Sequence, residues 1–132
     1  MSTDQRHAID LLSRVRYGRL ATSVRAMPFV APARHLVDGG AVLLRMHSRL
    51  SDHRACSGSV VAYSADNLES GASTLWSVQF TGTARIDSPT AEQLAAFGPA
   101  PRRINGEEYI PVYLRIDPRF ATVHTLEHSE AT

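Results

Sequence analysis

The stretch RLATSVRAMPFVAPARHLVDGGAVLLRMH, residues 19–47, decides the fold. It opens with RLATSV, whose alternating small and branched residues are typical of a short strand, and RAM then turns the chain into PFVAPARHLV, residues 28–37. The dipeptide Asp38-Gly39 is a strong hairpin signal. Residues 28–37 and 41–47 are therefore expected to pair antiparallel about this dipeptide.

Two prolines mark the second of these strands. Pro28 and Pro32 have no backbone N–H to donate to a neighbouring strand. They predict an edge or irregular strand whose backbone faces a ligand. Arg34 and His35, on the same strand, either line a groove or form the outward face of that edge.

A helix is expected before this stretch. Ala8, Leu11, Leu12 and Val15 recur at helical spacing, which predicts a leading helix over residues 1–17. Gly18 suits the position just past a helix end.

Short strands and one more helix follow the stretch. The helix is expected at SPTAEQLAAF, with Ser88 or Thr90 as its N-cap. After it, GPAPRRINGEE is expected to be an irregular excursion. Residues 127–132 are expected to form a frayed tail. Gly82 is expected to form a bulge. The strands are expected at SVVAYSA (59–65), LWSVQFTGTARI (75–86), VYLRI (112–116) and FATVHTL (120–126). Many strands without βαβ alternation predict a mainly β antiparallel barrel with flanking helices.

Composition limits the function. The 132 residues are 43% hydrophobic, which predicts one domain over residues 1–132. The apolar runs are too short to span a membrane and the N-terminus does not resemble a signal peptide, so we expect a cytoplasmic protein. A net charge of +1 argues against nucleic acid as a partner.

The residue types present exclude several kinds of lysine and cysteine chemistry. All 14 basic residues are arginine, which excludes a lysine Schiff base and a phosphate-binding lysine. The single cysteine, Cys56, excludes an intrachain disulfide and fits a packed core position. The histidines lack the spacing of a helical zinc pair, so no metal site is predicted.

A basic, hydroxyl-rich bridge joins two expected strands within LLRMHSRLSDHRACSGSVVAY, residues 43–63. Arginine forks, serine hydroxyls and backbone amides together can cradle a phosphate dianion. The alternative is a solvated surface loop, with Asp52 pairing one of the charges. The bridge residues are Arg45, His47, Ser48, Arg49, Ser51, His53, Arg54 and Ser57.

The run from GRLAT to SVVAY, followed by LWSVQFTGTARI, resembles the pyridoxamine 5'-phosphate oxidase-like family of split-barrel flavoproteins. The order of parts is similar: a helix, a proline-flanked second strand, an Asp-Gly hairpin, a basic loop, and a strand with an aromatic residue. The resemblance implies a six-stranded antiparallel Greek-key split barrel of the FMN-binding type. It also implies a homodimer with FMN in a groove at the interface.

The resemblance also assigns site residues. Arg45 and Met46 match the end of the third strand, and the loop after them matches the phosphate grip. Trp76, Ser77 and Gln79 match the strand that lines the flavin from the neighbouring subunit, although Trp76 also suits a core position. The loop residues assigned to the phosphate are His47, Ser48, Ser51, His53 and Arg54.

Three departures from the family pattern bear on activity. Met46 replaces a threonine, the loop lysine is absent, and the arginine-containing ending of the vitamin B6 oxidases is missing. We therefore expect an FMN-dependent oxidoreductase acting on an unknown small molecule other than pyridoxamine phosphate, with no protein nucleophile. The alternatives are a deazaflavin-dependent reductase and a non-catalytic flavin or haem carrier, for which His47 or His124 is the natural axial ligand.

Overall fold

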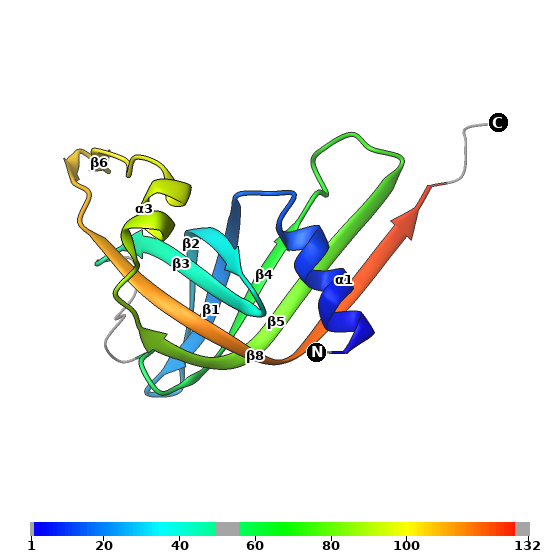
Figure 1. Cartoon of the computed structure of the whole chain (residues 1–132), viewed down its shortest axis with the longest axis horizontal. Helices are drawn as coiled ribbons and strands as arrows, with labels where there is room; N and C mark the ends of the chain where they lie inside the picture. Colours follow the sequence, from blue (N-terminus) through cyan, green and yellow to red (C-terminus); the bar gives the residue numbers. More distant parts are fainter. Residues whose placement is uncertain (1, 50–55, 129–132) are drawn as a thin grey trace.

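Six strands close into an antiparallel barrel in the order β1-β2-β3-β8-β5-β4 (Figure 1). The computed structural model describes residues 2–49 and 56–128. This architecture confirms the expected mainly β, six-stranded fold. The barrel strands are β1 (Tyr17–Val24), β2 (Met27–Asp38), β3 (Ala41–His47), β4 (Val60–Asp66), β5 (Thr74–Ile86) and β8 (Pro111–Glu127).

Two tight turns build the first three strands. Arg25 and Ala26 link β1 to β2 with positive φ angles of 53° and 64°, the backbone that a two-residue hairpin needs. Strand β2 pairs antiparallel with β3, as expected. The loop between them is Gly39-Gly40, one residue later than predicted, because Asp38 already pairs with Ala41.

The prolines act on only one half of β2. The whole strand pairs with β1, but its pairing with β3 begins at Arg34. Pro28 and Pro32 lie before that point, where one edge of β2 has no partner among the described strands. The edge-strand prediction is therefore right for this half, although the strand is regular.

One continuous strand, β8, replaces the two strands expected at residues 112–116 and 120–126. Gly82 of β5 pairs with Pro118, whereas Thr81 pairs with Phe120, so β8 carries an extra residue at this point. This irregularity confirms the bulge predicted at Gly82. Proline is tolerated at bulges, which is why Pro118 bends the strand without ending it.

Two helices flank the barrel. Helix α1 (Thr3–Leu12) lies against β5 and β8 and ends five residues before the predicted end at residue 17, with Ser13 as its C-cap. Gly18 lies inside β1, where an added Cβ would be 2.5 Å from the Tyr63 hydroxyl. Helix α3 (Ala91–Phe97) is capped by Thr90, one of the two predicted caps.

The segment between α3 and β8 is more ordered than the sequence suggested. It contains a small hairpin of β6 (Arg103–Ile104) and β7 (Glu107–Glu108) around Asn105 and Gly106, both with positive φ. At the other end, Glu127 is the last residue of β8, whereas residues 129–132 of the expected tail lie outside the described residues. No described helix is long and apolar enough to cross a membrane.

The core fills the barrel interior. Tyr63, Phe80 and Leu114 are fully buried there, together with Leu12 from α1 and Cys56, the packed cysteine expected from the sequence. Burial alternates along β5, so one set of its side chains faces the core and the other faces outward. The outward set, with its counterparts on the other strands, forms the surface on which a site can be built.

Candidate functional site

The outer face of β3 carries the predicted cofactor residues under a cover. Met46 belongs to the barrel core, so its neighbours Arg45 and His47 point to the outside. Both are nevertheless only 3% exposed. They are covered by the end of α3 and by the segment that follows it, residues 98–110, which we call the strap.

Arg45 is bound to the base of the strap. Its Nη1 donates to the carbonyl of Gly98 at 2.8 Å, and its Nη2 lies 3.3 Å from the carbonyl oxygen of Pro99. Its guanidinium also stands 5.2 Å from the centre of the Phe97 ring. The Nε of Arg45 is buried and has no hydrogen-bond partner among the described residues.

A second arginine lies beside it. Arg34 of β2 pairs in register with Arg45 and stands 5.9 Å from the same Phe97 ring. Tyr17 and Tyr113 continue this cross-strand row on either side, so the outer face reads Tyr–Arg–Arg–Tyr. Burial, with the charges of Arg16 and Arg45, lowers the pKa of Arg34.

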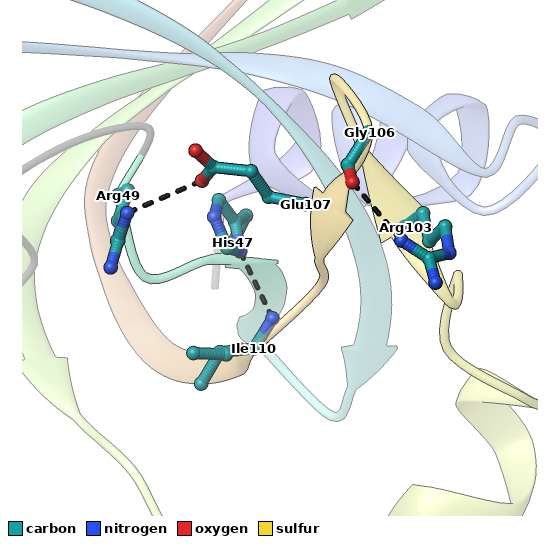
Figure 2. Close-up of polar contacts among 6 residues, drawn as sticks. All are labelled: His47, Arg49, Arg103, Gly106, Glu107 and Ile110. Atoms are coloured by element: carbon teal, nitrogen blue, oxygen red, sulfur yellow. Dashed lines mark hydrogen bonds and ion pairs between the residues drawn. The ribbon is translucent and has the colours of Figure 1, made fainter.

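His47 and Arg49 hold the other end of the strap (Figure 2). The backbone N–H of Ile110 donates to Nδ1 of His47 at 3.0 Å, and the Tyr109 ring lies 5.3 Å from the imidazole. Arg49 forms an exposed ion pair with Glu107 at 3.2 Å. Because Nδ1 of His47 accepts the N–H of Ile110, this nitrogen carries no proton in the contact.

A pocket of about 110 Å³ lies between the strap and the sheet. Arg34 and Arg45 form its charged side. Its other lining residues are Tyr17, Pro32, Ala33, Pro101, Ile104 and Tyr109.

A second pocket, of about 260 Å³, adjoins the first. The two share Tyr17 and Pro32, and the second extends over Arg19 to Asp66 of β4. We call the two pockets together the outer groove. It crosses β2 at Pro32, Ala33 and Arg34, at one end of the half that the sequence predicted to face a ligand.

The three candidates on β5 lie on two different faces. Trp76 is 7% exposed and belongs to the barrel core. Ser77 and Gln79 point outward and pair with Asp66 and Ser64 of β4. The structure therefore brings Ser77 and Gln79 to the side of the barrel that carries the groove, and places Trp76 and Met46 inside.

Ser48 also contacts the strap, whereas three further predicted residues lie outside the described part of the chain. Ser48 follows His47, and its backbone N–H donates to the carbonyl of Ile110 at 2.9 Å. Ser51, His53 and Arg54 lie outside the described residues, so their assignment to a phosphate stays a prediction.

Sequence reasoning missed the strap and its aromatic residues. Tyr109 and Phe97 cover β3 from positions about 50 residues further along the chain. One signal was available: Asn105-Gly106 is a preferred two-residue hairpin turn, which indicates ordered structure within the excursion.

The family model described as pyridoxamine 5'-phosphate oxidase matches residues 4–125. The uncharacterized protein Rv0080 of Mycobacterium tuberculosis is 37% identical over 100 residues, covering 71% of this chain. The match spans 64% of that relative's length, slightly less than two thirds.

Solved structures share the whole fold. The FAD binding protein from Mycobacterium smegmatis has a TM-score of 0.72 at 22% identity, and the match covers 98% of each chain. A heme binding protein from the same organism has a TM-score of 0.63 at 14% identity, covering 96% of this chain and 59% of that one. At these identities the likeness establishes the fold.

Proposed function

Because the chain belongs to the pyridoxamine 5'-phosphate oxidase family, we propose that it binds a flavin, FMN, in the outer groove and works as an FMN-dependent oxidoreductase. The observation that carries the proposal is the groove itself, which adjoins the basic end of β3 and crosses β2 at one end of its proline-marked half. The flavin-binding solved structure with the same fold supports it. A bound flavin supplies the hydride chemistry.

The described residues fit a flavin in part. Within the outer groove, we place the flavin ring system in the larger pocket, over Arg19 and Asp66, and the smaller pocket, which shares Tyr17 and Pro32 with it, stays open for a second ligand. Arg45 has an unpartnered Nε, but its terminal nitrogens are held by strap carbonyls. The phosphate is therefore better assigned to the end of the basic bridge, at Arg54, than to Arg45 alone.

A homodimer would cover the open side of this groove, where Tyr17 is 59% exposed. A cross-strand row runs over the outer face of the barrel from Val30, which is 66% exposed, to Phe120, which is 57% exposed. The row consists of Val30, Ala21, Ala62, Thr81 and Phe120. Small residues between two large apolar ones offer a flat surface that a two-fold partner can cover.

The protein's part in this proposal is orientation and electrostatics. Ser77 and Gln79 project from the outer face of β5 and can donate or accept hydrogen bonds at the edge of a flavin ring. The substrate is a small molecule, and a cytoplasmic location remains part of the proposal.

A haem carrier is the second candidate. His124 is exposed on the outer face of β8 and pairs with Ser77, which places an imidazole where it can ligate iron from outside the barrel. The haem-binding solved structure with this fold supports this candidate. His47 is less suited to the role because its Nδ1 accepts a hydrogen bond from the strap and its ring is buried.

The visible spectrum of the purified protein tests the proposal. Flavin bands are expected. A deazaflavin band or a Soret band would contradict the proposal in favour of the deazaflavin or haem alternative. If no flavin stays bound to the protein after incubation with FMN, the proposal is wrong without support for either alternative. Titration of FMN and riboflavin then tests the phosphate grip. Arg54→Ala should weaken FMN ten- to hundredfold, as loss of about 1.5–3 kcal/mol implies, and leave riboflavin unchanged.

A further inference from the structure

Two neighbouring arginines in the pocket beneath the strap have no carboxylate partner among the residues that the structure describes. All ion pairs of the described residues involve other arginines, at positions 14, 19, 49 and 115. Arg34 and Arg45 nevertheless pair in register on adjacent strands and flank one phenylalanine ring. Buried charges in proteins are ordinarily paired, because desolvation without compensation is costly.

Backbone carbonyls compensate these charges incompletely. The terminal nitrogens of Arg45 reach the carbonyls at the end of α3, where the helix dipole is negative. Its Nε faces no acceptor among the described residues. Arg34 donates from Nη1 to the carbonyls of Arg16 and His35, and no hydrogen bond of its Nη2 or Nε to a described residue occurs.

The geometry points to a site for a small carboxylate with a flat or short apolar body, bound between the Arg34–Arg45 pair and the underside of the strap. The Nε and Nη2 of Arg34, which no described residue accepts from, form a fork that matches the two oxygens of a carboxylate, and Arg45 adds its positive charge beside them. The rest of the pocket consists of tyrosine, proline, alanine and isoleucine side chains, which suit an apolar body. An engineered cavity of ~150 Å³ holds benzene, so a pocket of about 110 Å³ with an exposed tyrosine at its mouth suits one ring or a short chain.

A phosphate dianion fits this pocket less well. Phosphate sites in proteins are built from several converging backbone amides and hydroxyls. Here the lining offers two tyrosine hydroxyls, at Tyr17 and Tyr109, and two proline residues that have no N–H. A carboxylate monoanion needs fewer donors, and the Nε and Nη2 of Arg34 can supply them.

The pocket shares Tyr17 and Pro32 with the rest of the outer groove, so a carboxylate ligand there would lie beside the proposed flavin. The inference rests on the proposed function only in naming that ligand a substrate. Binding of a carboxylate at the pocket does not require the flavin, and the two are therefore tested separately.

Benzoate is the probe, and benzamide is its neutral counterpart of equal shape. Calorimetric titration of the flavin-free protein should show benzoate binding at least tenfold more tightly than benzamide. Arg34→Gln should weaken benzoate tenfold or more, with Arg34→Lys intermediate because it keeps the charge and loses the fork. Arg14→Gln is the matched control, since Arg14 forms an exposed ion pair with Asp10 of α1 and lines neither the pocket nor the strap, and it should leave benzoate affinity unchanged.

Each opposite result overturns the inference. Equal affinities for benzoate and benzamide would show that the pocket is apolar and does not recognise an anion. If benzoate does not bind at all, the proposed site does not exist. Arg34→Gln weakening FMN but not riboflavin would assign the arginines to the flavin phosphate. If Arg34→Gln does not fold by circular dichroism, the methyl signals of Ile104 in the wild-type protein give the answer, because benzoate should shift them and benzamide should not.

Discussion

A buried polar network at the junction of α1 and the barrel is expected to stabilise the fold by a measurable amount. Nδ1 of His35 lies 2.6 Å from the Tyr63 hydroxyl, and Nε2 lies 2.9 Å from the carbonyl of Leu12 at the end of α1. His35 is 2% exposed and Tyr63 is fully buried. The neutral imidazole satisfies both contacts by donating from Nε2 to the carbonyl and accepting from the hydroxyl.

Tyr63→Phe removes only the hydroxyl, which leaves Nδ1 of His35 as a buried acceptor without its partner. The cost of such an unsatisfied group is about 1–3 kcal/mol in the free energy of unfolding. Urea denaturation at pH 7.5 measures this difference, with the m value expected to stay constant. A loss below about 0.5 kcal/mol would show that the hydroxyl does not stabilise the fold.

The same network predicts a pH dependence. Burial, the largest cause, lowers the pKa of His35 below its ordinary value of 6.5, and the positive charge of Arg34 lowers it further. The unfolded chain therefore binds a proton more readily than the folded protein, so stability is present above about pH 6.5 and is lost as the pH falls toward the folded pKa. Each pH unit in that window is worth up to ~1.4 kcal/mol.

His35→Gln is the variant that isolates this effect, because it keeps hydrogen-bonding capacity and does not titrate. Its unfolding free energy should fall less between pH 7 and pH 5 than that of the wild-type protein. The other histidines contribute equally to both proteins, so only the difference between the two curves is used. Parallel curves would show that His35 is not the titrating group.

Four further outcomes are expected. Gly82→Ala should cost more than about 2 kcal/mol of unfolding free energy in urea denaturation, because its Cβ would lie 2.3 Å from the carbonyl oxygen of Asp117. Arg49→Ala should change stability by less than ~1 kcal/mol by the same measurement, since its ion pair with Glu107 is exposed. Ala62→Arg should convert a dimer to a monomer in sedimentation at micromolar concentration, and a wild-type monomer there would contradict the interface. The FMN-loaded protein should not turn over pyridoxamine phosphate at ~1 per second, an ordinary enzymatic rate, when its oxidation is followed by absorbance.

Local signals predicted the fold well because each depends on a few neighbouring residues. The Asp-Gly hairpin, the Thr90 cap and the Gly82 bulge all appear in the structure, within one residue of the prediction. The failures come from distant contacts. Asp117 and Pro118 read as a break between strands, and only the partner strand shows that the proline occupies a bulge.

The site was less predictable for the same reason. Strand alternation places Arg45 and His47 on the outer face of β3, and the sequence identifies them correctly as a basic pair at a strand end. The sequence does not show that the strap, about 50 residues further along the chain, supplies backbone carbonyls to Arg45 and a backbone N–H to His47. The sequence shows the chemistry of each side chain, but the topology of the fold decides which residue that side chain contacts.

The strap also explains why arginine and not lysine suits position 45. Its guanidinium reaches the carbonyls of Gly98 and Pro99 from two different nitrogens while its flat face lies toward the Phe97 ring. An ammonium is a compact point charge without a flat face, so it could not make the same set of contacts. Arg45 thus links the barrel to the strap, and through the strap to the pocket beside Arg34, so the stability of the fold and the shape of the proposed site depend on one side chain.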